Sequence, residues 1–305
     1  MKNRVLVTGA CGFIGYHIIN ELKNYDVEIL GVDRIVSNNV VDNVRFLAVD
    51  LLKIEELEKV LNDFKPDSII HLAAIASPTY QNVAELYDIN VRGSENLLEL
   101  IKKTCSPNTR VVLTSTAGVY GVADADYYDE EKTPYNPQNH YSYSKMVMEY
   151  ISRRYQDKLD IKIIRPFNIL GMNQSNNFLI PKLIEAFVNK QEVLRVGNLE
   201  TSRDFVDVEY SAKLFTQVAL QDTIDFNIIN ICTGQATKGI DIVNYLNEIT
   251  GYMPKIEIAQ EFLRANEIMR MVGNPTRCNE IMKNIAKPKE VKEILENMVI
   301  AYKEN

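Results

Sequence analysis

The 305-residue sequence lacks the features that mark several large classes of protein. No stretch approaches the run of about 18 apolar residues that a membrane-spanning helix needs. No apolar segment of the signal-peptide type follows the first residues of the chain. The four cysteines are scattered without a Cys-x-x-Cys pair, which argues against a metal site built from cysteines. We therefore expect a cytoplasmic protein that holds no metal and binds no membrane.

Basic residues are outnumbered by acidic ones, with 34 Lys and Arg against 41 Asp and Glu. The formal net charge of −7 and the pI of about 5.2 argue against nonspecific binding to nucleic acid. Low-complexity tracts and short-period repeats are missing as well, so the architecture has to be inferred from alternating elements. The length and the hydrophobic fraction of 46% fit a large α/β unit with a smaller lobe.

The first clear pattern that is present is a strand, a glycine-rich turn and a helix. Val5 to Val7 have the apolar character of a buried strand, and apolar residues then recur with helical spacing from Phe13 to Leu22. The residues that form the turn and open the helix are Gly9, Gly12, Phe13, Ile14 and Gly15. Glycines permit a tight turn that approaches phosphate oxygens closely, and the N–H groups at a helix start attract anions. The turn is therefore predicted to bind the pyrophosphate of a dinucleotide.

The choice between NAD and NADP depends on Asp33 and Arg34. Asp33 follows a second apolar strand, Val27–Val32, where its carboxylate would accept hydrogen bonds from the adenosine ribose hydroxyls. The same negative charge disfavours a 2′-phosphate, whereas the adjacent guanidinium of Arg34 could bind that phosphate in a bidentate manner. We predict NAD and leave NADP open.

Strands and helices are predicted to alternate through the first 170 residues. The predicted strands are Val5–Val7, Val27–Val32, Val44–Val49, Asp67–Leu72, Arg110–Thr114 and Ile161–Arg165, and the predicted helices are Phe13–Leu22, Ile54–Phe64, Asn82–Lys103 and Tyr141–Gln156. This alternation predicts an α/β fold, a Rossmann-type doubly wound parallel sheet whose ligand lies at the carboxyl ends of the strands.

The pattern changes after residue 170, which predicts a second, smaller lobe. We expect a dinucleotide-binding domain at 1–170, rejoined by about 208–250, and a nucleotide-sugar substrate lobe at 171–207 and 251–305. The predicted elements in this half are helix Ile180–Lys190, strand Phe226–Cys232, which would rejoin the sheet, and helix Gly239–Ile249. A crevice between two lobes is a usual place for a substrate.

Residues at the ends of the predicted strands are further candidates for cofactor binding. Asp50 and Leu51 follow the third strand and could flank an adenine ring. Leu72 closes the fourth strand, and the small side chains of Ala73 and Ala74 after it leave room for a ligand.

Two polar residues stand where apolar ones would be expected. Asn90 lies inside a predicted helix, where asparagine is unfavourable, so its amide is expected to have a hydrogen-bonding task, either structural or catalytic. His71 lies in an apolar strand and is interpreted as a core residue with satisfied hydrogen bonds.

A tyrosine and a lysine one helical turn apart are the strongest catalytic candidates. Tyr141 and Lys145 are spaced i, i+4, so they share one face of their helix. A cation beside a phenol favours the phenolate, and we expect Lys145 to lower the pKa of Tyr141 enough for proton exchange near neutral pH. Thr116, in a hydroxyl cluster after strand Arg110–Thr114, could hydrogen-bond the reacting oxygen. By itself, the Tyr-x-x-x-Lys spacing is also typical of an exposed helix face.

Together these motifs resemble the extended short-chain dehydrogenase/reductase family across nearly the whole chain. Segments Arg165–Asn168 and Arg203–Val208 are similar to its nucleotide-sugar branch. The resemblance assigns Thr116, Tyr141 and Lys145 to catalysis and lets Lys145 also contact the nicotinamide ribose. It also implies a homodimer in which the helices carrying Asn90 and Tyr141 pair across a two-fold axis.

Within that branch the sequence most resembles GDP-4-keto-6-deoxy-mannose reductases. The resemblance implies that Asn168 and Arg203 contact the nucleotide diphosphate, that Arg264 binds phosphate and that Glu267 binds the ribose of the nucleotide. The proline usual after that arginine is Ala265 here, which weakens the guanosine assignment and leaves a UDP-sugar open.

One departure from the family narrows the reaction. The 4,6-dehydratases of this family carry an acidic pair directly after the catalytic threonine, whereas this chain has Ala117 and Gly118. Without that acid and base, elimination of water is not expected. Hydride transfer at the sugar C4 remains, as a reductase or as a 4-epimerase with tightly bound NAD. A non-catalytic nucleotide sensor on the same fold is a third, more remote interpretation.

Overall fold

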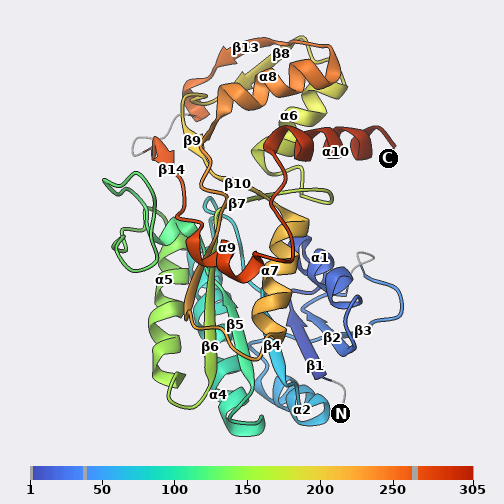
Figure 1. The fold of residues 1–305 in the computed structure, drawn as a ribbon, viewed down its shortest axis with the longest axis vertical. Helices are drawn as coiled ribbons and strands as arrows, with labels where there is room; N and C mark the ends of the chain where they lie inside the picture. Colours follow the sequence, from blue (N-terminus) through green and yellow to red (C-terminus); the bar gives the residue numbers. More distant parts are fainter. Residues whose placement is uncertain (1–2, 37–39, 263–266, 305) are drawn as a thin grey trace.

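The fold is described from a computed structural model, which covers residues 3–36, 40–262 and 267–304. Its lower lobe in Figure 1 contains one seven-stranded sheet with helices on both faces. The strands of this sheet are β1 (Asn3–Thr8), β2 (Val27–Asp33), β3 (Arg45–Ala48), β4 (Ser68–His71), β5 (Arg110–Thr114), β6 (Asp160–Pro166) and β11 (Ile228–Ile231).

The strand order confirms the predicted doubly wound topology. The order is β11-β6-β5-β4-β1-β2-β3, and every neighbouring pair is parallel. The expected return of the chain to this sheet is also confirmed, because β11 pairs with β6. Thr8 at the end of β1 lies opposite Val32 and His71, so the carboxyl ends of the central strands meet at one edge.

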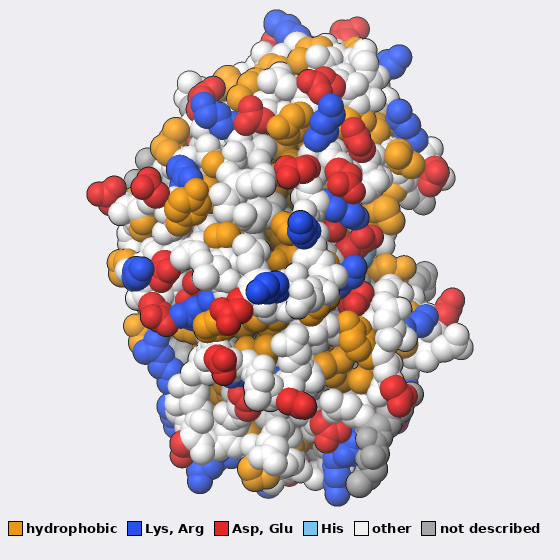
Figure 2. Space-filling model, in the orientation of Figure 1, with side chains coloured by type: hydrophobic (Ala, Val, Ile, Leu, Met, Phe, Trp, Pro, Cys, Tyr) orange, Lys and Arg blue, Asp and Glu red, His pale blue; other side chains and the backbone are white. Residues whose placement is uncertain are grey.

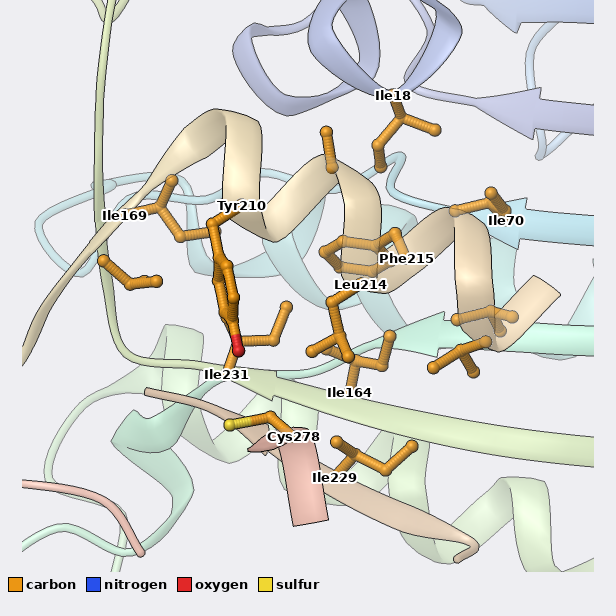
Figure 3. Packing of buried hydrophobic residues seen from close by; sticks show 14 of the residues in the cluster. Ile18, Ile70, Ile164, Ile169, Tyr210, Leu214, Phe215, Ile229, Ile231 and Cys278 are labelled. Carbon is orange, nitrogen blue, oxygen red and sulfur yellow. The ribbon is translucent and has the colours of Figure 1, made fainter. Parts of the chain in front are cut away.

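Alternating side chains along each strand fill two separate cores. Val5 and Val7 of β1 lie in one cluster, with α1 (Phe13–Leu22), α7 (Val208–Leu220) and α9 (Thr276–Met282). Leu6 faces the other cluster, with α2 (Ile54–Phe64), α4 (Ser94–Thr104) and α5 (His140–Ser152). Figure 3 shows the first cluster, where Leu214 and Phe215 of α7 lie among side chains from the sheet and from α1.

The predicted helix Asn82–Lys103 is wrong as a single α-helix. The chain instead forms α3 (Val83–Tyr87), a π-helical segment η1 (Asp88–Gly93) and then α4. The π-helical segment contains Asn90, and such wide turns are frequent at functional sites. The predicted helix Tyr141–Gln156 is too long at its end, because α5 ends at Ser152 and a 3₁₀ turn, η3 (Arg153–Tyr155), follows.

The second lobe has its own apolar core. Its elements are α6 (Leu179–Val188), β8 (Val193–Val196), α8 (Gly239–Thr250), β13 (Lys255–Ile258) and α10 (Val291–Glu304). Helix α8 lies within the return expected at 208–250 but packs with α6 and α10, whereas α9 packs on the sheet lobe. The division into domains at the expected boundaries therefore stays a proposal.

Short strands cross from the sheet lobe to the second lobe. They are β7 (Asn168–Leu170), β9 (Ser202–Arg203), β10 (Phe205–Asp207), β12 (Thr237–Lys238) and β14 (Arg270–Met271). Strand β7 pairs with β10, and β9 pairs with both β12 and β14. Buried Asp204, between β9 and β10, accepts hydrogen bonds from the backbone N–H groups of Thr233, Gly234 and Gly273, which ties these crossings together.

The surface carries charges of both signs. Figure 2 shows Lys and Arg side chains interspersed with Asp and Glu over the face in view. Within the described residues no helix combines the length and apolar character that crossing a membrane requires. No group of three or more potential metal ligands occurs among those residues either.

Candidate active site

The glycine turn between β1 and α1 has the shape that a pyrophosphate requires. Gly9 has a φ of +69°, and a Cβ there would lie 2.7 Å from the backbone nitrogen of Ala73. A Cβ on Gly15 would overlap the carbonyl oxygen of Gly9. Gly12 is the N-cap of α1 and offers no capping side chain, so the N–H groups of the first turn are left for an anion. These features fit a dinucleotide.

The predicted ribose ligand lies beside this turn. Asp33 ends β2, and its carboxylate accepts hydrogen bonds from the backbone N–H groups of Cys11 (3.0 Å) and Arg34 (2.8 Å). The side chain is thereby fixed next to the phosphate-binding turn. The Arg34 guanidinium points to Glu85 at 3.6 Å, so a carboxylate competes for the cation that NADP would need.

The remaining cofactor candidates line the same edge of the sheet. Asp50 and Leu51 follow β3, and the Asp50 carboxylate accepts a hydrogen bond from the Leu52 N–H. Leu72 and Ala73 follow β4, where their N–H groups donate to Thr8, and Ala74 is next along the chain. Phe13 and Ile14 are half-buried against the core under α1.

The Asn90 side chain forms several hydrogen bonds, as expected from its position inside a helix. Its side-chain oxygen accepts from the Ile75 N–H at 2.8 Å, and its amide nitrogen donates to the Ile75 carbonyl at 3.1 Å and to the Ser144 hydroxyl at 3.0 Å. The side chain therefore pins the loop after β4 to the helix that carries Tyr141. Of the two tasks left open, these bonds show the structural one.

His71 is a neutral core residue, as interpreted from the sequence. Its Nδ1 lies 2.7 Å from the Thr8 hydroxyl and its Nε2 lies 2.9 Å from the Ser94 hydroxyl. Ser94 donates its own proton to the Asn90 carbonyl, so it accepts from Nε2. Burial, reinforced by the charge of Lys145, lowers the pKa of His71 to about 3.

The structure brings Thr116 and Tyr141 together. Helix α5 begins at His140 because Asn139 caps it, accepting a hydrogen bond from the Ser142 N–H at 2.9 Å. Thr116 caps a short 3₁₀ turn, η2 (Ala117–Val119), directly after β5. The Tyr141 phenol and the Thr116 side chain are hydrogen-bonded. The Thr116 hydroxyl and the Tyr141 phenol are thus brought together although they are 25 residues apart in the sequence.

The expected direction of the Tyr141 pKa is wrong. Burial raises the pKa of Tyr141 to about 12, and the hydrogen bond with Thr116 opposes this only in part. Desolvation disfavours the phenolate, so the pKa moves in the direction opposite to the one that the i, i+4 spacing of Tyr141 and Lys145 suggested. The phenol is accordingly protonated at neutral pH.

Lys145 is buried instead of lying on an exposed helix face. Its side chain is 2% exposed, and its ammonium donates a 2.8 Å hydrogen bond to the Thr114 carbonyl. Burial lowers the pKa of Lys145 to about 8, against the opposing effect of Glu149. The candidate catalytic corner thus consists of Thr116, Tyr141 and Lys145, and the lysine lies at the end of β5.

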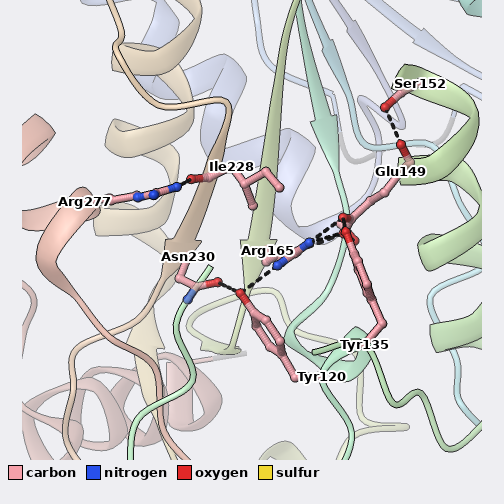
Figure 4. Close-up of polar contacts among 9 residues, drawn as sticks. Tyr120, Tyr135, Glu149, Ser152, Arg165, Ile228, Asn230 and Arg277 are labelled. Atoms are coloured by element: carbon pink, nitrogen blue, oxygen red, sulfur yellow. Dashed lines mark hydrogen bonds and ion pairs between the residues drawn. The ribbon is translucent and has the colours of Figure 1, made fainter. Parts of the chain in front are cut away.

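A charged cluster beneath this corner was missed in the sequence analysis. The Arg165 guanidinium donates to both carboxylate oxygens of Glu149, at 3.0 and 2.6 Å, and both residues are buried. Arg165 also donates to the hydroxyls of Tyr120 and Tyr135 at 2.8 and 2.6 Å (Figure 4). The one sequence signal was the continued four-residue spacing, Tyr141, Lys145 and Glu149.

The predicted substrate residues lie where the short strands cross between the lobes. Asn168 donates from its amide to the Asp204 carbonyl at 3.1 Å, which places it beside Arg203 and the start of β10. The charge of Arg203 reaches Tyr128, whose pKa it lowers against the larger effect of burial. Glu267 lines a pocket together with Tyr128 and Arg270. Arg264 lies outside the described residues.

The family now follows from comparison with known proteins. The family model described as "NAD dependent epimerase/dehydratase family" matches residues 5–232. The chain belongs to this family, and NAD is its cofactor. It is an enzyme of the nucleotide-sugar branch of the extended short-chain dehydrogenases/reductases, as the resemblance implied.

Individual relatives cover almost the whole chain. It is 35% identical over 275 residues to a GDP-6-deoxy-D-talose 4-dehydrogenase from Aggregatibacter actinomycetemcomitans, spanning 90% of this chain and 89% of the relative. It is 26% identical over 291 residues to a GDP-6-deoxy-D-mannose reductase from Pseudomonas aeruginosa, spanning 91% and 90%. Among solved structures, the UDP-glucose 4-epimerase of Thermus thermophilus in complex with NAD matches with a TM-score of 0.85 at 26% identity, covering 98% of this chain and 99% of that one.

Proposed function

We propose that this protein is a GDP-sugar oxidoreductase that transfers hydride between NAD(H) and C4 of the sugar. The proposed reaction is the reduction of a GDP-4-keto-6-deoxy-hexose. The hydrogen-bonded pair of Thr116 and Tyr141, with Lys145 buried beside it, carries this proposal. Two relatives named for GDP-6-deoxy sugars, one a 4-dehydrogenase and one a reductase, support the substrate class.

The protonation state of Tyr141 fits the role of proton donor in the proposed reduction. A pKa of about 12 keeps the phenol protonated at neutral pH. A reductase needs such a donor, because the oxygen at C4 gains negative charge as hydride arrives. Thr116 would donate its hydroxyl hydrogen to the same oxygen and hold it beside Tyr141. NADH, when bound, supplies the hydride.

The residues after Thr116 argue against a dehydratase. A Cβ on Gly118 would overlap the Ser142 hydroxyl and lie 3.3 Å from that of Thr116. Ala117 is buried at the start of the 3₁₀ turn. An acidic side chain in place of Gly118 would displace the Ser142 hydroxyl, and the acid and base of elimination are missing here.

We further propose roles for the residues around this corner. The turn of Gly9, Gly12 and Gly15 would bind the pyrophosphate of NAD, and Asp33 its adenosine ribose. The other proposed cofactor contacts are Phe13, Ile14, Arg34, Asp50, Leu51, Leu72, Ala73, Ala74, Asn90, Tyr141 and Lys145. Asn168, Arg203, Arg264 and Glu267 would bind the nucleotide part of the substrate.

The second candidate is a 4-epimerase, because an epimerase can use the same three catalytic residues. The similarity to a UDP-glucose 4-epimerase solved with NAD favours this alternative. Purified protein incubated with NADH or NADPH and a panel of GDP- and UDP-sugars, including 4-keto forms, separates the two. Cofactor consumed in proportion to product supports the reductase. Product formed without net change in cofactor supports the epimerase, and turnover of UDP-sugars alone contradicts the GDP assignment.

We also propose that the protein is a cytoplasmic homodimer. Two large side chains on the outer face of α5, Tyr143 and Tyr150, are 43% and 48% exposed. In the proposed dimer, α5 and the helical segment carrying Asn90 pair with the same elements of a second copy across a two-fold axis. This isologous contact would cover both tyrosine rings.

A further inference from the structure

The catalytic face of α5 continues one turn beyond the lysine. Tyr141, Lys145 and Glu149 follow one another at four-residue spacing, which aligns their side chains along the helix. Lys145 and Glu149 are 2% and 0% exposed, so two residues of opposite charge are buried one helical turn apart. Carboxylates are rarely buried this completely unless they are paired.

Glu149 is held in place from three sides. The Ser115 hydroxyl donates to Oε1, and the Tyr135 hydroxyl donates to Oε2 at 2.7 Å. Arg165 spans both oxygens from β6 (Figure 4). The carboxylate therefore cannot swing away, and its ion pair with Arg165 lies one helical turn from Lys145 on α5.

We propose that Glu149 is a positioning residue that keeps the Lys145 ammonium protonated beside Tyr141 in the buried catalytic corner. The consequence for turnover rests on the function proposed above, whereas the effect on Lys145 itself does not. Burial by itself would drive the lysine towards its neutral form, in which it lacks the charge that serves Tyr141 and the cofactor.

Among the groups packed around Lys145, Glu149 is the one that can keep its ammonium protonated. From β4 comes His71, which is neutral at pH 7, and from β5 the Thr114 carbonyl, which accepts a hydrogen bond but carries no full charge. From its own helix come Tyr141, which is protonated, and Glu149, whose ion-pair partner is the cation of Arg165 from β6. Glu149 is thus the carboxylate that raises the pKa of Lys145, holding it at about 8 despite burial.

The direct test is the titration of Lys145 followed by NMR of lysine side chains, assigned by loss of one signal in Lys145→Met. In Glu149→Gln, the pKa of Lys145 should fall by about one or more, the range for loss of a close opposite charge. Tyr135→Phe is the matched control, because it removes one hydrogen bond to Glu149 but keeps every charge. In this control Lys145 should titrate as in the unaltered protein.

Glu149→Gln leaves Arg165 buried without its partner, which can prevent folding. The double variant Glu149→Gln with Arg165→Met removes both charges, and it should show a smaller fall in the Lys145 pKa, because the cation of Arg165 is lost as well. Circular dichroism establishes which variants fold. If Lys145 titrates unchanged in the folded variant that lacks Glu149, the proposal is overturned.

Kinetics provide the functional counterpart. In the variant that lacks Glu149, the alkaline limb of the kcat/KM profile should move to lower pH, because Lys145 loses its proton earlier. Glu149→Asp, which keeps the charge, should restore much of the shift. A protein that turns over none of the sugars would contradict the proposed function, while the NMR titration would still decide the role of Glu149.

Discussion

Lys145→Met should abolish most activity. It should also change the free energy of unfolding relative to the unaltered protein, and this change should favour the variant more at neutral pH than at alkaline pH. The pKa of Lys145 is about 8 in the folded protein, against an ordinary value of 10.5 for a solvated lysine. The difference of 2.5 corresponds to roughly 3 kcal/mol of stability at about 1.4 kcal/mol for each factor of ten. Because the side chain is 2% exposed, solvent screens this cost little.

The sign of the effect follows from proton binding. Between pH 8 and 10.5 the unfolded chain holds a proton on this lysine that the folded protein releases, so the stability of the unaltered protein rises with pH through that window. Below pH 8 both states are protonated and the cost of burying the charge is present in full. Methionine has nearly the same length and no charge, so it carries no such dependence.

The measurement is urea unfolding of both proteins between about pH 7 and pH 10. The difference in unfolding free energy should change by roughly 2 to 3 kcal/mol across this range, in favour of Lys145→Met at the neutral end. Loss of the hydrogen bond to Thr114 shifts all values of the variant equally and does not alter this trend. Parallel curves for the two proteins would refute the reasoning, because they would mean that Lys145 is not buried as a cation.

The other predictions concern turnover, cofactor and assembly. Tyr141→Phe should lower kcat by about 10²-fold or more with little change in NAD affinity, and steady-state rates at the unaltered level would show that the hydroxyl is not the proton donor. Thr116→Val should also lower kcat, and the double variant should be far less than multiplicatively worse in the same assay. NADH should bind more tightly than NADPH in fluorescence titrations, and Asp33→Ala should narrow the gap; a preference of the unaltered protein for NADPH would contradict the role of Asp33. Light scattering should give the mass of a dimer, and a monomer at micromolar concentration would rule out the proposed assembly.

The first part of the fold could be predicted because its signals are local. The strand, glycine turn and helix up to Leu22 lie within one short stretch, and α1 begins at Phe13 and ends at Leu22 as expected. Backbone conformation in such a turn is limited by the residues themselves, and Gly9, with its positive φ, is the clearest case. Strand Arg110–Thr114 and helix Ile54–Phe64 also have their predicted bounds, since their apolar periodicity and end signals lie within each segment.

The break in the helix around Asn90 needed the tertiary fold. Helix propensity alone favours a continuous helix from Asn82 to Lys103. The π-helical segment instead places the Asn90 amide against the Ile75 backbone and the Ser144 hydroxyl, partners from two other segments of the chain. Their position cannot be deduced from the sequence of the helix itself.

The corner formed by Thr116, Tyr141 and Lys145 shows most clearly what the sequence determines and what the tertiary structure decides. Sequence spacing by itself determined that Tyr141 and Lys145 share a helix face, and the family motif assigned that face a function. Only tertiary structure decided that the face is buried, since β5 and β6 pack over it while Tyr143 and Tyr150 point outward. That burial sets the protonation of Tyr141 and Lys145 and makes Glu149 and Arg165 necessary partners, because desolvation depends on every neighbouring segment and not on local sequence.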